Sequence, residues 1–190
     1  PASIIRYAGA TATLTVSATG ASLTIVGHSE RREAQRESDE EVRSKAEAGL
    51  AAGLSVIFCI GESLDVREAG KAVGTVQAQL DALHRIGLVA LAGEALTQVP
   101  GTLDYPIWAI GTGKVASPAD ISEMHGALRE RLIAAYGDAG NEMRILYGGS
   151  VNASNAAEIF AVDNVDGALV GGASLTAEKF LPIVEAAARA

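Results

Sequence analysis

Short, continuous apolar runs alternate along this chain with longer segments in which apolar residues recur at helical spacing. The runs at 23–26, 55–60, 144–147 and 166–170 predict buried strands, and a poorer run at 102–108 predicts another. Uninterrupted apolar runs are typical of a parallel sheet that is covered on both faces. The alternation of strand and helix therefore predicts an α/β fold.

Helical spacing and capping signals predict the covering helices. Asp39 is the expected cap of a helix that runs to about Ala52, and Ser63 opens an interrupted helical region to about residue 83. Ser117 is the expected cap of the best marked helix, 118–136. Further helices are predicted near 89–96, at 153–161 and after Thr176, and the residues expected to face inward are Ile121, Met124, Leu128 and Leu132 in one helix and Phe180, Ile183, Val184 and Ala187 in the last.

Each predicted strand ends in glycine or polar residues, so the carboxyl ends carry the candidate chemistry. His28 follows the first strand, Gly61 and Glu62 follow the second, and pairs of glycines follow the last two. The carboxyl ends of parallel strands meet at one edge, so we expect one shared site there. Barrels and open doubly wound sheets both place their sites at this edge, and the pattern alone leaves both architectures open.

The stretch between the predicted strand ending at 108 and the helix starting at 118 has stiff ends and a centre of small residues. Such a loop can close over a site as a lid, and its free amide groups can hold an anion. Taken alone, it is also a common glycine-rich turn between a strand and a helix. The predicted lid consists of Pro106, Ile107, Trp108, Ala109, Ile110, Gly111, Thr112, Gly113, Lys114, Val115 and Ala116.

Two residues after the first strand are the candidate catalytic groups. A neutral imidazole at His28 can donate a hydrogen bond to a carbonyl or shuttle a proton. A histidine bonded to backbone for structural reasons is the alternative. Glu30 can organise a cation or a helix terminus. His84 and His125 lie in or beside predicted helices and are expected to face solvent.

Glycines after the last two strands predict a phosphate cup, which we define as Gly148, Gly149, Ser150, Gly171 and Gly172. Glycine lets the main chain approach phosphate oxygens closely, and the start of the following helix adds a favourable dipole. Each pair of glycines is a weak signal alone, but together with the lid the two pairs favour an anion site.

Composition narrows the class of partners. The chain has 190 residues, 48% of them hydrophobic, which suits one soluble domain over 1–190. Its formal net charge of −8 argues against nucleic acid and anionic membranes as general partners.

Arg31 and Arg32 are expected to form salt bridges with Glu62 and its neighbours. The single cysteine, Cys59, is expected to be a small buried residue. One cysteine and no signal pattern fit a reducing cytoplasm, and no metal-ligand spacing is present.

Five motifs in this order closely resemble the triosephosphate isomerase family. They are IVGHSERR at 25–32, CIGE at 59–62, the lid at 106–116, YGGSVN at 147–152 and DGALVGGASL at 166–175. The resemblance covers about residues 21–83 and 106–188. It implies a (β/α)8 barrel, of which these 190 residues hold about six βα units.

The resemblance also implies the chemistry and the partners. The family interconverts dihydroxyacetone phosphate and glyceraldehyde 3-phosphate through an enediolate, without cofactor or metal, as a cytoplasmic homodimer. By resemblance His28 is the electrophile that polarises the carbonyl, and residues 106–116 are the closing loop. The phosphate-binding backbone is then supplied by Gly111, Ser150, Gly171 and Gly172.

The chain departs from the family pattern at the catalytic base. Tyr105 occupies the position of the family's glutamate, and a phenol with a pKa near 10 is a poor base at neutral pH. Asp104 is one residue away, but neighbouring strand residues face opposite sides, so it substitutes only if the strand slips by one. The 190 residues contain no Asn-x-Lys motif. Ala8-Gly9-Ala10 is their nearest match to the family's dimer loop.

Two alternatives to an isomerase stay open at this point. A non-catalytic phosphate-binding or scaffold protein keeps the cup and the lid without the base and the lysine. An open doubly wound nucleotide-binding sheet fits less well, because no Gly-x-Gly-x-x-Gly motif follows the first strand and Gly113-Lys114-Val115 lacks the serine or threonine of a Walker motif.

Overall fold

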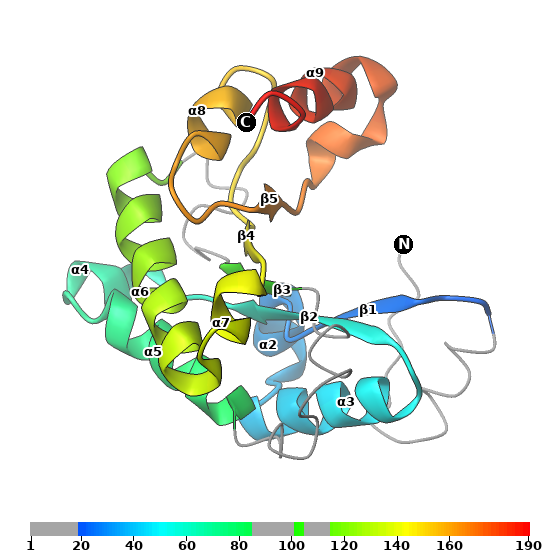
Figure 1. The fold of residues 1–190 in the computed structure, drawn as a ribbon, viewed down its shortest axis with the longest axis vertical. Coiled ribbons are helices and arrows are strands. Elements are labelled where there is room, and N and C mark those ends of the chain that lie inside the picture. The colour runs from blue at the N-terminus through cyan, green and yellow to red at the C-terminus, as the bar shows by residue number, and fades with distance from the viewer. Residues whose placement is uncertain (1–18, 85–100, 105–114) are drawn as a thin grey trace.

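A single parallel sheet organises the molecule. The computed structural model describes residues 19–84, 101–104 and 115–190, with the backbone alone at 83–84 and 101–104. The described strands, which pair in parallel in chain order (Figure 1), are β1 (Leu23–Val26), β2 (Ser55–Ile60), β3 (Gly101–Asp104), β4 (Ile145–Tyr147) and β5 (Gly167–Ala168). A doubly wound sheet reverses its strand order at one point, and the order of these five strands contains no reversal. The predicted parallel α/β fold is confirmed, whereas the doubly wound alternative does not describe these strands.

Three long helices cover one face of the sheet. They are α3 (Asp39–Ala51), α5 (Ala72–His84) and α6 (Pro118–Tyr136). The shorter described elements are α2 (Ser29–Gln35), α4 (Leu64–Glu68), α7 (Ala139–Glu142) and α8 (Ala156–Phe160), which lie between strands, and η4 (Gly172–Leu175) and α9 (Ala177–Ala187), which follow β5. In the part of the chain that the structure describes, no helix has the length and apolar character needed to cross a membrane.

Serine residues are the N-caps of two of the long helices. Ser117 caps α6 as predicted, and its side chain and Asp120 form a reciprocal capping box. The predicted cap of α3 is wrong by one residue, because Ser38 is the cap and Asp39 is the first helical residue. Glu41 lies three residues after Ser38 and completes the second capping box, which explains the shift.

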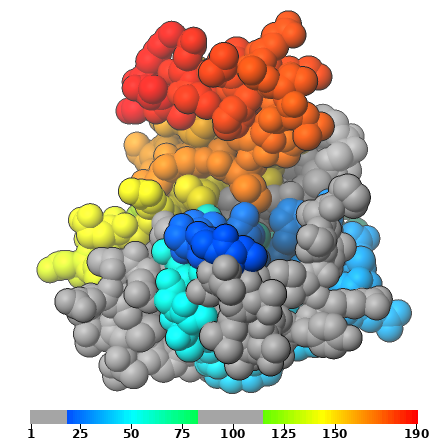
Figure 2. Space-filling view, turned by 90° about the vertical axis from the view of Figure 1, so that its right-hand side faces the viewer, coloured from blue at the N-terminus to red at the C-terminus, as the bar shows by residue number. Residues whose placement is uncertain are grey.

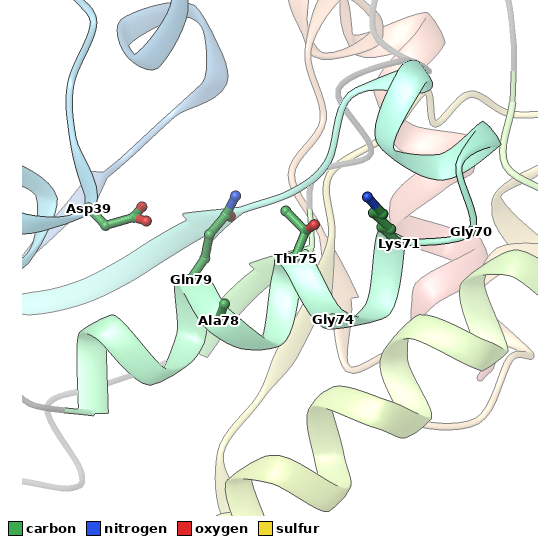
Figure 3. Close-up of a pocket in the computed structure, with 7 residues that line it drawn as sticks. All are labelled: Asp39, Gly70, Lys71, Gly74, Thr75, Ala78 and Gln79. Atoms are coloured by element: carbon green, nitrogen blue, oxygen red, sulfur yellow. The ribbon is translucent and has the colours of Figure 1, made fainter.

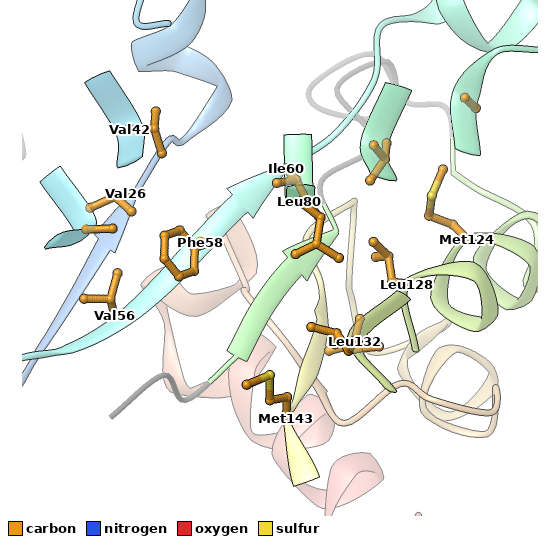
Figure 4. Close-up of a cluster of buried hydrophobic side chains, with 14 residues drawn as sticks. Val26, Val42, Val56, Phe58, Ile60, Leu80, Met124, Leu128, Leu132 and Met143 are labelled. Atoms are coloured by element: carbon orange, nitrogen blue, oxygen red, sulfur yellow. The ribbon is translucent and has the colours of Figure 1, made fainter. Parts of the chain in front are cut away.

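The main core lies between the sheet and these helices (Figure 4). Alternate residues of β2, namely Val56, Phe58 and Ile60, contribute to it and are at most 4% exposed. On β1, Val26 belongs to the same core, whereas Leu23 and Ile25 are about 40% exposed. The helix-covered face is therefore packed at Val26 and along β2, and the opposite face at β1 reaches the surface, where β1 appears in blue in Figure 2.

Helix α6 buries the predicted stripe and one polar residue besides. Ile121, Met124, Leu128 and Leu132 are at most 2% exposed, as predicted. The prediction that His125 faces solvent is wrong, because its side chain is fully buried and its Nδ1 lies 2.9 Å from the carbonyl oxygen of Asn164. The loop before β5 supplies this carbonyl, so the histidine joins α6 to that loop.

The prediction for the last helix is mostly wrong. Of the four residues expected to face inward, only Ile183 is buried, whereas Phe180 is 36% and Val184 44% exposed. The main contacts of α9 are with α8 and η4 rather than with the sheet. These short elements offer little apolar surface against which α9 can bury its own apolar face. Figures 1 and 2 both show α8, η4 and α9 gathered at one end of the molecule, in orange and red.

Side-chain hydrogen bonds shorten the C-terminal elements relative to the prediction. The Asp166 carboxylate accepts from the amide of Ile145 and from Arg129, and β4 begins at Ile145 instead of 144. Asn152 and Asn155 form a hydrogen-bonded turn, so α8 begins at 156 instead of 153. Strand β5 covers 167–168 instead of 166–170. Of the strand predicted at 102–108, residues 102–104 lie in β3, and 105–108 lie outside the described residues, as does the helix predicted near 89–96.

The burial of His125 gives a pH-dependent stability. Burial, opposed by the Asn164 bond and the Asp166 charge, holds the pKa of His125 below its usual 6.5. Below about pH 6.5 the unfolded chain therefore binds more protons than the folded one, so the free energy of unfolding decreases as the pH is lowered through this range, by up to about 1.4 kcal/mol per pH unit. Urea unfolding between pH 5 and 8 should show a steeper dependence in the parent than in His125→Gln. Equal slopes would contradict the assignment.

Candidate active site at the carboxyl ends of the strands

The strand register brings the predicted site loops to one edge. Ile60, Asp104, Tyr147 and Ala168 are register partners across four neighbouring strands. The described segments after β2, β4 and β5 leave the sheet from this common row, as the sequence predicts. The side chains of Ile60 and Tyr147 are both packed in the apolar clusters, and Asp104 occupies the same row of the register.

His28 lies at the end of β1, half-buried, as the N-cap of α2. Gly27 before it has φ +75°, and a Cβ there would lie 2.9 Å from the carbonyl oxygen of Cys59, so the turn requires glycine. The Nδ1 of His28 accepts a long hydrogen bond, 3.4 Å, from the amide of Glu30. In a neutral ring this bond leaves the proton on Nε2, where it can be donated to a ligand. The Glu30 side chain is exposed in the first turn of α2.

Arg32 holds the backbone around His28. Its Nε donates to the carbonyl of Gly27 at 2.8 Å, and its Nη2 reaches the carbonyl of Cys59 at 3.4 Å. Its Nη1 binds the carboxylate of Asp39 at 2.6 Å. One guanidinium thus joins the ends of β1 and β2 to the start of α3. No pattern in the sequence separated this arginine from its neighbour.

The expected partners of the two arginines are partly wrong. Both form salt bridges, but Arg32 pairs with Asp39, and Arg31 pairs with Glu37, which also binds Lys45. Burial opposes ionisation of Glu37, yet the bonds from Lys45 and Arg31 outweigh it and lower the pKa of this carboxyl.

Glu62, the partner expected for Arg31 and Arg32, instead binds Arg67. It is 1% exposed, and its Oε1 accepts from Arg67 at 2.8 Å. Arg67 also binds Asp120, 2.9 Å away, at the start of α6. The hydrogen bond from Ser117 and the charge of Arg67 lower the pKa of Asp120. This chain of contacts links the end of β2 to the first turn of α6, just after Ala116.

The phosphate cup is built on neighbouring strands. Gly148, Gly149 and Ser150 follow β4, Gly171 and Gly172 follow β5, and the amide of Leu169 donates to the carbonyl of Tyr147 at 2.9 Å. A Cβ on Gly149 would lie 2.2 Å from the hydroxyl oxygen of Tyr147, so the loop rests directly on that ring. Backbone amides of two adjacent loops at one edge can jointly bind an anion.

Gly172 is the first residue of the 3₁₀ helix η4, and Gly171 is its N-cap. Both are exposed, and a Cβ on either would meet nothing within 4 Å. The amide and the hydroxyl of Ser174 both donate to the carbonyl of Gly171. The dipole expected from the helix after Ser150 is small, because α8 has only five residues and begins at 156.

Several predicted site residues lie outside the described residues. These are Tyr105 and the lid from Pro106 to Lys114, including Gly111. At the end of the lid, Val115 is 46% exposed and Ala116 is buried in the smaller apolar cluster. Asp104 is described in its backbone alone.

A groove of about 570 Å³ lies elsewhere, along the exposed side of α5 (Figure 3). Thr75 and Gln79 face it from successive turns of that helix, Lys71 faces it from just before the helix, and Asp39 borders it. None of the predicted site residues whose side chains the structure describes lines this groove. The residues at the strand ends are therefore the better candidates for the functional site.

Among the side chains that the structure describes, no three His, Cys, Asp or Glu residues gather as metal ligands do.

Cys59 is buried in the middle of the site's scaffold. It is 1% exposed on β2, and burial raises the pKa of its thiol to about 12. A thiol that holds its proton at neutral pH is not a nucleophile, in agreement with the predicted structural role.

The fold and these loops define an α/β protein that presents a histidine and two glycine-rich turns at the carboxyl edge of a parallel sheet. The sequence profile named triosephosphate isomerase matches residues 6–187. The chain belongs to the triosephosphate isomerase family.

Curated relatives agree with this assignment. The chain is 51% identical over 170 residues to the triosephosphate isomerase of Ruegeria sp. strain TM1040, an alignment that covers 89% of this chain and 66% of the relative. It is 47% identical over 165 residues to that of Nitratidesulfovibrio vulgaris strain Miyazaki F, covering 87% and 64%. The triosephosphate isomerase of Bordetella pertussis is 44% identical over 180 residues, covering 95% and 69%. The chain thus spans about two thirds of the length of these relatives.

The contact between Gly149 and Tyr147 predicts a selective effect of alanine in the cup. Gly149→Ala drives a methyl group into the phenol, and we expect urea unfolding to show a loss of roughly 1–3 kcal/mol. The matched control is Gly172→Ala, whose Cβ meets open space and should change stability by less than about 0.5 kcal/mol. Similar losses in both variants would contradict the role assigned to the Tyr147 ring.

Proposed function

We propose that the chain binds triose phosphates and interconverts dihydroxyacetone phosphate and glyceraldehyde 3-phosphate, on a (β/α)8 architecture. The family match over residues 6–187 carries this proposal. The described sheet supports it, because five parallel strands in chain order are the arrangement of consecutive units in such a barrel.

The phosphate group is assigned to the cup and to Gly111. Ser150 and the glycines after β4 and β5 offer backbone amides at adjacent strand ends, where the main chain can approach phosphate oxygens. An acidic protein with a net charge of −8 needs such a local donor set to hold an anion. Binding the phosphate there leaves the three-carbon part to reach toward β1 and β2.

His28 is assigned to the carbonyl oxygen of the substrate. A neutral imidazole with its proton on Nε2 donates to that oxygen as charge develops, the arrangement known for this family. A base removes a proton from the carbon next to the carbonyl, which gives an enediolate. Return of a proton to the other carbon completes the isomerisation, with no change in the number of atoms or electrons.

The base is where this chain differs from its family. Tyr105 stands at the glutamate position, and a phenol keeps its proton at neutral pH. The only carboxylate beside it is Asp104, whose register partners Ile60 and Tyr147 pack into the apolar clusters. Strand alternation therefore favours position 105 for the site. We propose that turnover is slow.

A second candidate function follows from the same observation. Without an effective base, the cup and His28 bind a phosphorylated triose without converting it. The chain is then a phosphate-binding member of the family. Both candidates share the ligand and differ in turnover alone.

Three further features are proposed from the family. We assign residues 1–190 to one domain, the protein to the cytoplasm, and the assembled form to a homodimer. Analytical ultracentrifugation tests the last assignment, and a monomer at micromolar concentration would contradict it.

Turnover of glyceraldehyde 3-phosphate by the purified chain tests the proposed activity. We expect His28→Ala to lower kcat/KM by roughly 10²-fold or more, because the carbonyl loses its hydrogen-bond donor. Binding of inorganic phosphate, which meets only the cup, should change little and serves as the control. Equal turnover in parent and variant would contradict the role of His28, and phosphate binding without turnover in the parent would support the second candidate.

Substitution at position 105 tests the missing base. Tyr105→Glu should raise turnover by less than the roughly 10²-fold that a well-placed general base contributes, because the 190 residues also contain no Asn-x-Lys motif. Tyr105→Gln, similar in size but uncharged, is the control and should not raise it. Rates typical of an ordinary enzyme in the glutamate variant would overturn the inference that a second group is needed.

A further inference from the structure

The turn that follows the first half of the cup is held by one side-chain amide. The Nδ2 of Asn155 donates to the carbonyl of Ser150 at 3.0 Å, and its Oδ1 accepts from the amide of Asn152 at 2.8 Å. Both the donor and the acceptor of this amide have partners, so its orientation is fixed. A flipped side chain would place its NH₂ group against the amide of Asn152 and its oxygen against the carbonyl of Ser150.

These two bonds determine the direction of a peptide group in the cup. The carbonyl of Ser150 belongs to the peptide that it shares with Val151, and the planar trans peptide places the N–H of Val151 on the opposite side. Binding of that carbonyl by Asn155 therefore also orients the next amide. Val151 itself is 8% exposed and packed in the smaller apolar cluster, which limits rotation further.

The loop is thus supported at both ends. The Tyr147 ring supports it below Gly149, and Asn155 holds it after Ser150. A set of amides that must meet one phosphate loses affinity when it has to be ordered at the moment of binding.

We propose that Asn155 is a positioning residue for the phosphate cup, because its amide holds the turn 150–152 in the shape that receives a phosphate group. This inference rests on the proposed function. Asn155 need not touch the ligand. Its effect passes through the backbone of Ser150.

The sequence offers a matched pair of variants. Asn155→Asp keeps the acceptor for Asn152 but turns a carboxylate oxygen toward the Ser150 carbonyl. Asn152→Asp introduces the same charge in the same turn, and it keeps the acceptor that binds the amide and the hydroxyl of Ser154. The difference between the two variants isolates the bond to Ser150 from the change in charge.

Two measurements on the purified chain test the inference. In the ligand-free protein, amide hydrogen exchange at 150–152 should accelerate in Asn155→Asp and stay near the parent in Asn152→Asp. Isothermal titration with inorganic phosphate should show a dissociation constant roughly five- to tenfold weaker for Asn155→Asp than for Asn152→Asp, as expected for one lost hydrogen bond. Asn155→Ser keeps a favoured helix cap without the reach to Ser150, and it should repeat the effect if the aspartate variant folds poorly.

The outcomes separate this inference from the proposed function. Equal phosphate affinity of the two aspartate variants, with a parent that binds, would overturn the positioning role alone. Unchanged exchange at 150–152 in both Asn155 variants would do the same. A parent chain that binds no phosphate would overturn the proposed function, and this inference with it.

Discussion

Parallel backbone pairing in chain order is the constraint on which the other features depend. Because β1 to β5 each pair in parallel with their sequence neighbours, every described strand ends at the same edge of the sheet. That arrangement packs α3, α5 and α6 over a single core. It also sends His28 and the glycine turns to one side, although more than a hundred residues separate them in the chain.

The same kind of contact stabilises this edge at several places. Side-chain donors bind backbone carbonyls where strands end: Arg32 at Gly27, Gln79 at Gly61, Asn155 at Ser150. Gln79 also accepts from the Gly61 amide, so it satisfies both polar groups of that residue. Loops at strand ends leave the ladder of the sheet, and their polar groups need other partners. Here these partners also fix the shape of the candidate site.

Local patterns predicted the regular elements well and the pairing of side chains poorly. The bounds of β2 and α6 match the prediction, because an uninterrupted apolar run and a capping box leave little freedom. Burial of His125 was missed, since its bond to Asn164 joins residues 39 apart in the chain. The exposure of Phe180 was missed because an apolar stripe shows that a face needs covering but does not show what covers it.

Cys59 gives the protein an internal reporter of its own opening. It is the single cysteine of the chain, it lies on β2 between two neighbouring strands, and its carbonyl accepts a hydrogen bond from Arg32. A thiol this deeply enclosed and protonated reacts with alkylating reagents only when a local opening exposes it. The rate of labelling therefore counts opening events of the scaffold beneath the site, without any introduced probe.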